Sequence, residues 1–92
     1  GFVIVENPGL YTFWTESDDG VRLEVAGETS IENWTEHSAT WDSGSISLSE
    51  GFHPLVLEFY ENTGDAVMRL EYQGPDIPQK TIPTSVLAHE PF

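Results

Sequence analysis

The sequence predicts an all-β protein, an antiparallel β-sandwich or barrel formed by one domain over residues 1–92. Apolar residues recur with a period of two along most of the chain, as expected when alternate side chains of a strand face a core. No window of the sequence carries a convincing helical stripe. Gly-, Asn- and Asp-containing turns separate the apolar runs at short intervals, and this spacing is typical of sandwiches and barrels.

Four strands are expected in the first part of the chain, at Phe2–Val5, Leu10–Thr15, Val21–Val25 and Thr29–Trp34. Leu10–Thr15 is aromatic and β-prone on both faces, which indicates a central strand. Val21–Val25 alternates apolar with charged residues, which indicates a half-buried strand. The intervening Asp19-Gly20 is a strong hairpin signal, and Ala26-Gly27 turns the chain again.

The second part of the chain is expected to begin with a loop over Thr35–Ser43. Apolar residues then alternate with serines up to a turn at Glu50-Gly51. Phe52–Tyr60 is the longest expected strand, with Leu55, Leu57 and Phe59 on one face, and a further strand ends at Tyr72. The prolines at positions 75, 78 and 83 indicate an extended closing segment.

Charge is the strongest compositional signal, because sixteen Asp and Glu residues stand against three Lys and Arg, with a net charge of −13. Nucleic-acid binding needs a cationic surface, which Arg22, Arg69 and Lys80 cannot supply. Anionic membranes are excluded for the same reason. No apolar run approaches the roughly 18 residues of a membrane span, so no membrane insertion is expected. Bound divalent cations or salt would relieve the repulsion among the acidic groups.

The sequence contains no convincing catalytic constellation. The absence of cysteine removes thiolate catalysis, disulfides and Cys-based zinc sites. There is no Gly-x-Ser-x-Gly nucleophile elbow, and His37, His53 and His89 lack metal-ligand spacing. Asp18 and Asp19 are adjacent in one turn and cannot easily flank a glycosidic bond across about 5–9 Å. We therefore expect a protein that is not an enzyme.

Four segments carry a resemblance to a known family: GLYTFWTESDDGVRLEVAG (residues 9–27), IENW (31–34), LEFYENTGDAVMRLEY (57–72) and IPTSVL (82–87). Together they resemble the PA14 domain, the β-sandwich named after the anthrax protective antigen and also found in glycosidases, bacterial adhesins and yeast flocculins. The resemblance covers nearly the whole chain and implies the same sandwich. At position 26, Ala replaces the usual turn Asp of the family, a change expected to be harmless.

The family's domains also extend further toward the N-terminus than this sequence does. Phe2–Val5 aligns with the strand just before the YTF motif, so the opening strands of the fold are expected to be missing. The chain begins with Gly rather than Met, and we therefore expect it to be processed or excised from a longer protein.

Asp18 and Asp19 are the strongest candidates for a binding site. Two adjacent carboxylates repel each other, and Glu16 adds a third carboxylate nearby. Calcium takes about six to eight oxygen ligands and would stabilise such a cluster. In the calcium-dependent sugar-binding members of the resembled family, this Asp-Asp pair is joined by a cis peptide and holds the ion. The vicinal hydroxyls of the sugar then complete the coordination sphere.

The same resemblance implies further calcium ligands, namely the amide oxygen of Asn62 and the backbone carbonyls of Gly64 and Ala66. Both motifs also have a simpler explanation. Ser-Asp-Asp-Gly and Asn-Thr-Gly are common turn sequences, because Asp and Asn tolerate the left-handed conformation and Gly adopts it freely. The two loops support one calcium site only if they lie at the same end of the sandwich.

Three tryptophans could stack on the face of a sugar. Trp14 alternates into a strand and is expected in the core, and Trp34 matches a family position and is expected to be structural. Trp41 lies in an expected loop, where exposure makes it the candidate carbohydrate-binding tryptophan. Asn33-Trp34-Thr35 is also an N-glycosylation sequon, which has meaning only in a eukaryotic secretory pathway.

Two functions remain open at this point. The first is a calcium-assisted carbohydrate-binding module of a secreted or cell-surface protein, in which Asp18, Asp19 and Trp41 contact a glycan. The alternative is a structural or assembly module, such as a filament or adhesin subunit, without lectin activity. Missing opening strands favour the alternative, because an uncovered sheet edge can pair with another chain. Phe2–Val5 would then be donated to a neighbouring copy, or the edge would pair with a longer host chain.

Overall fold

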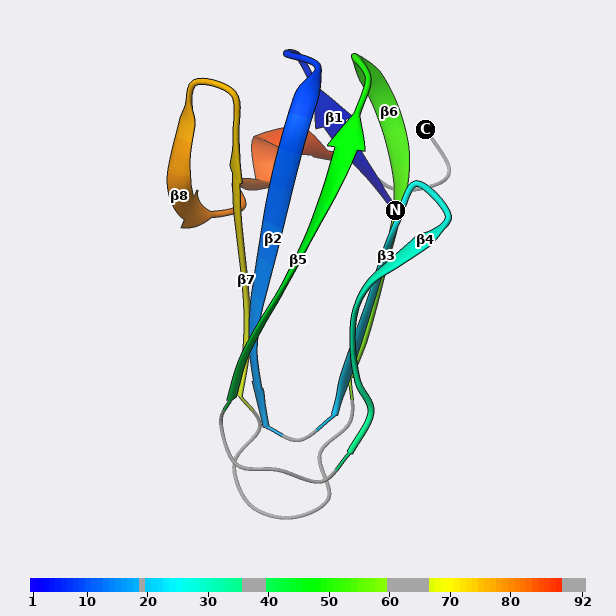
Figure 1. The fold of residues 1–92 in the computed structure, drawn as a ribbon, viewed down its shortest axis with the longest axis vertical. Helices are drawn as coiled ribbons and strands as arrows, with labels where there is room; N and C mark the ends of the chain where they lie inside the picture. The colour runs from blue at the N-terminus through cyan, green and yellow to red at the C-terminus, as the bar shows by residue number, and fades with distance from the viewer. Residues whose placement is uncertain (19, 36–39, 60–66, 89–92) are drawn as a thin grey trace.

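The computed structural model describes residues 1–18, 20–35, 40–59 and 67–88, which form two antiparallel sheets packed face to face (Figure 1). In these residues, no helix has the length and apolarity needed to cross a membrane. The elements in chain order are β1 (Phe2–Val5), β2 (Gly9–Asp18), β3 (Val21–Val25), β4 (Glu28–Asn33), β5 (Thr40–Leu48), β6 (Gly51–Phe59), β7 (Val67–Gly74), β8 (Ile77–Thr81), the short 3-10 helix η1 (Thr84–Val86) and β9 (Leu87–Ala88).

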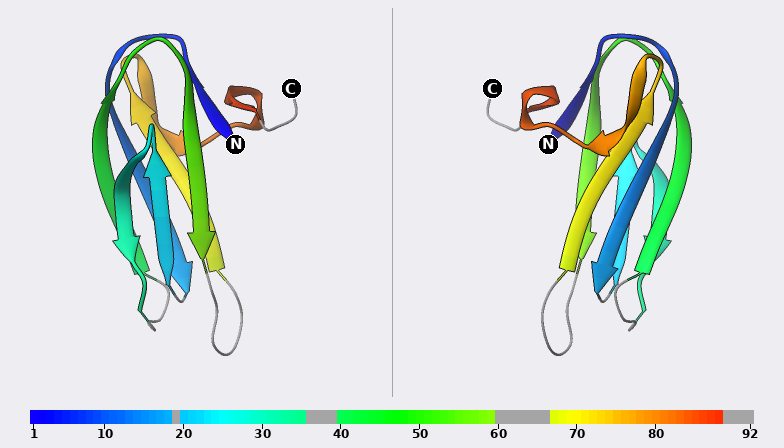
Figure 2. Two further views of the ribbon diagram at one scale, coloured as in Figure 1. Left: turned by 90° about the vertical axis from the view of Figure 1, so that its right-hand side faces the viewer. Right: turned by 90° about the vertical axis from the view of Figure 1, so that its left-hand side faces the viewer.

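The predicted all-β sandwich is confirmed. One sheet has five strands in the order β4-β3-β6-β1-β9, and the other has four in the order β5-β2-β7-β8. β2 lies between β5 and β7, which agrees with its expected central position. Figure 2 shows the sheets from the side, with the β1–β2 and β5–β6 connections arching from one sheet to the other at the same end.

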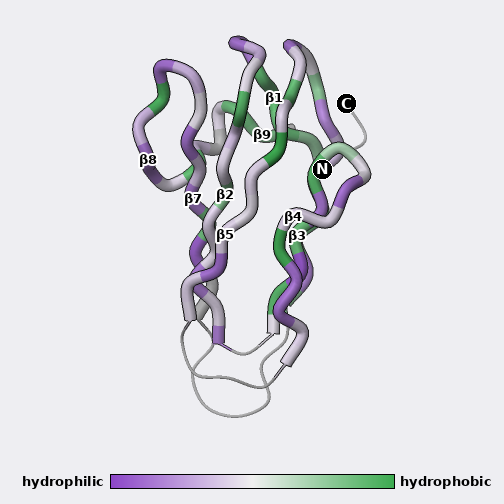
Figure 3. Tube along the Cα trace, in the orientation of Figure 1, coloured by the Kyte–Doolittle hydropathy of each residue, from purple (hydrophilic) through white to green (hydrophobic). Residues whose placement is uncertain are grey.

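The core lies between the sheets, because alternate residues of each strand point inward. Figure 3 shows the resulting alternation of hydrophobic and hydrophilic segments along the chain. The buried apolar residues are Val3, Val5, Tyr11, Phe13, Val21, Leu23, Val25, Ile31, Leu48, Tyr72 and Ile82. On β2, Phe13 is the inward aromatic residue, so Trp14 lies half-buried on the outer face. The prediction that Trp14 is a core residue was therefore wrong.

The hairpin predicted from Asp19-Gly20 is not present, because β2 and β3 belong to different sheets. The β2–β3, β4–β5 and β6–β7 connections all cross between the sheets. Strand pairing places them at one end of the molecule: Asp18 is opposite Val67, and Val21 is opposite both Asn33 and Phe59. We call this end, at the bottom of Figure 1, the loop end.

The opposite end carries the β3–β4 and β7–β8 hairpins, and we call it the hairpin end. In the β3–β4 turn, Ala26 has φ 54° and Gly27 has φ 78°, as in a type I′ turn. A left-handed conformation costs a residue with a Cβ about 1–2 kcal/mol. Asp has a Cβ as well, although it enters this conformation more often than Ala does. That the exchange at position 26 is harmless stays a prediction. In the β7–β8 turn, Asp76 has φ 59° after Pro75, as in a type II turn.

The outer strands β4 and β5 approach each other closely along one open edge of the sandwich. A Cβ atom on Gly44 would overlap the backbone of Ser30, so this position requires glycine. Asn33 Nδ2 donates a hydrogen bond to Asp42 Oδ2 at 3.1 Å across the same edge. Since β5 begins at Thr40, the expected loop over residues 35–43 is wrong in its second half.

β1 is an interior strand, paired with β6 on one side and β9 on the other. Val3 and Val5 are buried in the core, and Leu55 N donates to Gly1 O at 2.9 Å. The expectation that Phe2–Val5 is available for donation to a neighbour does not agree with this arrangement. Self-association and pairing with a longer host chain stay predictions.

Candidate functional site

Asp18 is the last residue of β2, and it stands at the loop end. Its half-buried side chain follows Trp14 and Glu16 in the outward alternation of the strand. Its partner across the sheet is Val67, the first residue of β7. Val67 directly follows residues 60–66 in the chain, so the segment that contains Asn62 rejoins the sheet beside Asp18.

The other expected calcium ligands, Asp19, Asn62, Gly64 and Ala66, lie outside the described residues, so their coordination stays a prediction. Within the described ranges, no group of three or more His, Asp or Glu side chains could hold a metal ion by itself. Two observations bear on whether these residues fit a calcium ion. The segment with Asp18-Asp19 connects β2 to β3, and the segment with Asn62 connects β6 to β7, both at the loop end. Neither connection is a hairpin, because each links strands of different sheets. The expected donors are all oxygen atoms, which suits a hard cation such as Ca²⁺.

Glu16 has an ion-pair partner of its own near the loop end. Its Oε1 lies 3.1 Å from Nε of Arg69, so its charge is already paired. Trp41 is opposite Glu16 on the neighbouring strand, and 45% of its surface is exposed. Diagonal neighbours in an antiparallel pair lie about 7–8 Å apart. Trp41 therefore lies diagonally beside Asp18 on the outer face, in a strand rather than in the expected loop.

Arg69 is a further candidate residue, which was not expected from the sequence. Its side chain is 69% exposed and lies over β2 at the outer face near the loop end. An exposed ion pair of this kind contributes about 0–1 kcal/mol to stability, so its guanidinium remains suited to donating hydrogen bonds to a ligand. The sequence signal that could have identified Arg69 is its outward position in the alternating pattern of β7, two residues after Val67.

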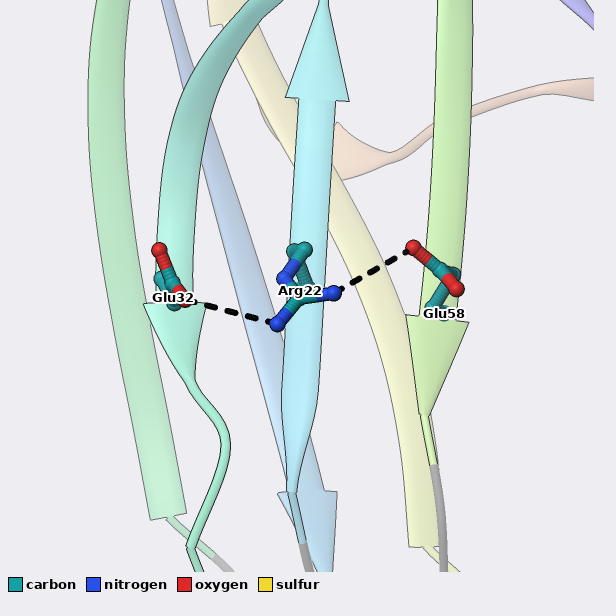
Figure 4. Close-up of polar contacts among 3 residues, drawn as sticks. All are labelled: Arg22, Glu32 and Glu58. Atoms are coloured by element: carbon teal, nitrogen blue, oxygen red, sulfur yellow. Dashed lines mark hydrogen bonds and ion pairs between the residues drawn. The ribbon is translucent and has the colours of Figure 1, made fainter.

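Trp34 belongs to a separate cluster on the five-stranded sheet. The guanidinium carbon of Arg22 lies 4.9 Å from the centroid of the Trp34 ring. The same guanidinium lies between Glu32 and Glu58, at 3.4 and 3.7 Å (Figure 4). Trp34 is 41% exposed, yet its ring covers a cation that already has two carboxylate partners. This arrangement supports the structural role expected for Trp34.

Asn33, the acceptor residue of the sequon, is held by two side-chain hydrogen bonds. Its Nδ2 donates to Asp42, and Thr35 Oγ1 donates to its Oδ1 at 2.7 Å. A glycan on Nδ2 would disrupt the bond that links the edges of the two sheets. The geometry therefore disfavours glycosylation at Asn33.

The remaining polar groups to be placed are the three histidines and the hydroxyl of Thr15. His53 Nε2 lies 2.7 Å from the carbonyl oxygen of Ser49, so its contact is local. His37 and His89 lie outside the described residues. Thr15 Oγ1 is buried beneath the outer face without a hydrogen-bond partner. Neither His53 nor Thr15 contributes to the surface that contains Asp18 and Trp41.

Comparisons with known proteins agree with the fold. A family model described as the PA14 domain matches residues 1–85. Anti-sigma-I factor RsgI3 of Acetivibrio thermocellus is 37% identical over 78 residues, which make up 84% of this chain and 12% of that protein. The chain therefore spans only a small part of this curated relative.

Solved structures give the same result. An anti-sigma factor domain-containing protein matches with a TM-score of 0.91 and 34% identity over 100% of this chain and 33% of its own. A second, from Clostridium clariflavum, matches with a TM-score of 0.77 and 34% identity over 94% of this chain and 30% of its own. The PA14 domain of the antifreeze protein MpAFP matches with a TM-score of 0.82 over 95% of this chain and 47% of its own, and its 20% identity supports the fold alone.

Proposed function

The chain belongs to the PA14 domain family, and we propose that it is a calcium-assisted carbohydrate-binding domain that works outside the cytosol as the sensing part of a larger protein. The similar anti-sigma factors are much longer than the region that matches. Their names describe regulators of transcription factors rather than enzymes. A sensory, non-catalytic role for this domain is consistent with both facts.

The observation that carries this proposal is the meeting of three features at the loop end. Asp18 ends β2 there, the segment of residues 60–66 rejoins the sheet opposite it, and Trp41 is exposed diagonally beside it. The simpler explanation of the acidic motif as a hairpin turn does not apply, because the chain crosses between sheets at that point. A carboxylate pair in such a connection offers several oxygen ligands to a hard cation.

In the proposed site, each described residue has a distinct task. The carboxylate of Asp18 supplies oxygen to the cation, and the exposed ring of Trp41 offers a flat apolar surface to the C–H face of a sugar. Arg69 is placed to donate hydrogen bonds to sugar hydroxyls from the other side of β2. A bound Ca²⁺ would supply open coordination positions for two vicinal hydroxyls of the glycan.

A location outside the cytosol forms part of the proposal. Extracellular calcium modules work with dissociation constants of about 10⁻⁴–10⁻³ M, an affinity that cytosolic calcium concentrations do not satisfy. The alternative assembly role has less support, because β1 is paired on both sides within its own chain.

A glycan array probed with and without chelator tests the proposal. The wild-type domain is expected to bind a restricted set of glycans in millimolar calcium and to lose this binding in EDTA. Asp19→Ala should bind none of them, whereas Glu24→Ala, a change on the outer face of the other sheet, should bind as the wild type does. Binding that is unchanged in EDTA, or an Asp19→Ala variant with wild-type binding, would show that calcium plays no part in glycan binding.

A further inference from the structure

A cavity of about 330 Å³ lies at the hairpin end, on the side of the molecule away from Asp18 and Trp41. It is open to solvent on one side and bordered by the β1–β2 connection, the β7–β8 hairpin and the segment around η1. Its polar lining comes from Glu6, Tyr11, Tyr72, Asp76, Lys80 and Ser85, and its apolar lining from β1, β8 and η1. Ligand pockets begin at about 300 Å³, so this volume suits a ligand of about one ring.

The two tyrosines of the cavity differ in how their hydroxyl groups are satisfied. Their rings stack with centroids 6.4 Å apart. The Tyr11 hydroxyl donates to the carbonyl oxygen of Asn7 at 2.7 Å. Tyr72 is only 3% exposed, yet among the described residues its hydroxyl makes no hydrogen bond. Among the described residues the fully buried atom without a partner is Thr15 Oγ1. The Tyr72 hydroxyl instead reaches the cavity, where a ligand can form a hydrogen bond with it.

The charges around the cavity limit the chemistry of that ligand. Glu6 and Asp76 are carboxylates and repel anions, and Lys80 at the rim repels cations. Carboxylates accept hydrogen bonds, the lysine donates them, and the Ser85 and Tyr72 hydroxyls can do either. A neutral polyhydroxylated ring matches this mixture, because its hydroxyls both donate and accept while its C–H face contacts the apolar wall.

Backbone conformation at the rim gives an independent indication. Asp76 holds a left-handed φ of 59°, which glycine or asparagine would adopt at lower cost. Strained positions of this kind cluster at ligand-binding sites. In the β7–β8 turn, this conformation brings an acidic side chain to the cavity lining, where glycine would bring none.

We infer that the hairpin-end cavity is a second, calcium-independent subsite for one neutral pyranose ring, with the Tyr72 hydroxyl as its central hydrogen-bonding group and Glu6, Asp76 and Lys80 at its rim. It shares only its ligand class with the proposed function, since the two sites lie at opposite ends and contain different residues. A glycan chain could then be contacted by the domain at two places.

The test uses the domain in EDTA, so that the loop end does not contribute, titrated with glucose, galactose, mannose and xylose and followed by amide chemical shifts. At least one sugar is expected to shift amides of residues 6–7, 72 and 76–80. Tyr72→Phe should weaken this binding about tenfold through the loss of one hydrogen bond, while its thermal stability stays at or above that of the wild type. Asp76→Asn tolerates the same φ and removes only the charge, and it should weaken binding too.

The cavity subsite and the calcium site can be confirmed or excluded independently of each other. If none of the four sugars shifts the cavity amides, or if Tyr72→Phe and Asp76→Asn bind as tightly as the wild type, the subsite is excluded, whatever calcium does at the loop end. If sugars shift the cavity amides in EDTA and both variants weaken the effect, the subsite stands even where the glycan array shows no calcium dependence. Glu24→Gln, on the outer face of β3 and outside the cavity lining, serves as the matched control for charge.

Discussion

The loop end and the hairpin end of the sandwich differ in how the chain connects its strands. At the loop end, the β2–β3, β4–β5 and β6–β7 connections all cross from one sheet to the other. At the hairpin end, β3–β4 and β7–β8 are tight turns within a sheet, and β1–β2 and β5–β6 cross between sheets. Crossing connections leave backbone and side chains free of the regular sheet pattern. Binding residues are often found on such connections because a rigid scaffold positions them.

The polar groups of the two ends are also satisfied differently. At the hairpin end, the Tyr11 hydroxyl and the His53 ring bond to backbone carbonyls of nearby turns. At the loop end, the Glu16 carboxylate is paired with Arg69, while adjacent Asp18 and Asp19 place two more negative charges in a strongly acidic chain. The two ends therefore differ in charge, and the adjacent carboxylates make the loop end the place where we expect an added cation to bind.

The largest loss of stability is expected from Gly44→Ala, which disrupts the contact between β4 and β5 that supports the loop end. The new methyl group would overlap the backbone of Ser30 and push β4 away from β5. Overpacking of this kind costs about 1–3 kcal/mol, and backbone overlap places this variant near 3. Chemical denaturation measures the loss, with the exposed Ser43→Ala on the same strand as control. A Gly44→Ala domain as stable as the wild type would show that β4 and β5 do not need this close approach.

Calcium removal is expected to have the next largest effect, and only through the loop end. At a hundredfold excess over the dissociation constant, a ligand of the folded state stabilises it by about 2.7 kcal/mol. Asn62→Ala should reduce this gain while leaving the calcium-free stability close to that of the wild type, as measured by thermal unfolding with and without EDTA. If Asn62→Ala loses the same stability in both conditions, Asn62 is a turn former and not a ligand.

The hairpin end should instead respond to alkaline pH. Burial raises the pKa of Tyr11 and of Tyr72 above the ordinary value of 10.0. The folded state then holds these protons more tightly than the unfolded state does, so stability present below about pH 10 is lost as the pH rises toward the folded pKa. Tyr11→Phe removes one of these groups and its hydrogen bond to Asn7, at a cost of about 1 kcal/mol at neutral pH.

Denaturant unfolding at pH 8 and pH 11 checks this prediction. The wild type should lose more stability between the two pH values than Tyr11→Phe does. An equal loss in both proteins would mean that the buried tyrosine does not control the alkaline response.

The smallest effect is expected at the β3–β4 turn. Ala26→Gly removes the Cβ from a residue with φ 54° and should raise stability by about 0.5–1 kcal/mol. The side chain of Ala26 is half-buried against the core, which limits the gain. Differential scanning calorimetry is the suitable measurement, and a lower melting temperature would show that the lost contact outweighs the relief of strain. Neither outcome should change calcium binding at the loop end.

Much of the fold could be predicted because the alternation of apolar residues is a local property. The strands at Phe2–Val5 and Val21–Val25 were predicted with their observed bounds, and the turn at Ala26-Gly27 was placed correctly. Which aromatic residue of β2 faces inward was not predictable with the same ease, since Phe13 and Trp14 are adjacent and both apolar. The phase of the strand is set by the opposing sheet, which contributes Val21 and Leu23 to the same core.

The sheet to which each strand belongs could not be predicted from local patterns either. A period of two is the same in both sheets, so Asp-Gly between two strands predicts a hairpin even where the strands never pair. For the candidate site, Asp18 and Trp41 could be named separately from the sequence. Their diagonal placement, and the pairing of Glu16 with Arg69, depend on long-range strand register and became visible only in the structure.

A calcium titration followed residue by residue with amide chemical shifts is the decisive measurement for a calcium site at the loop end. We expect saturable shifts to concentrate at the loop end, at residues 17–20, 33–41 and 59–67. These shifts should be absent in Asp19→Ala and retained in Glu24→Ala. The hairpin end, including Tyr11 and Tyr72, should not respond. Shifts spread evenly over the acidic surface without saturation, or no shifts at all at millimolar calcium, would contradict a calcium site at the loop end.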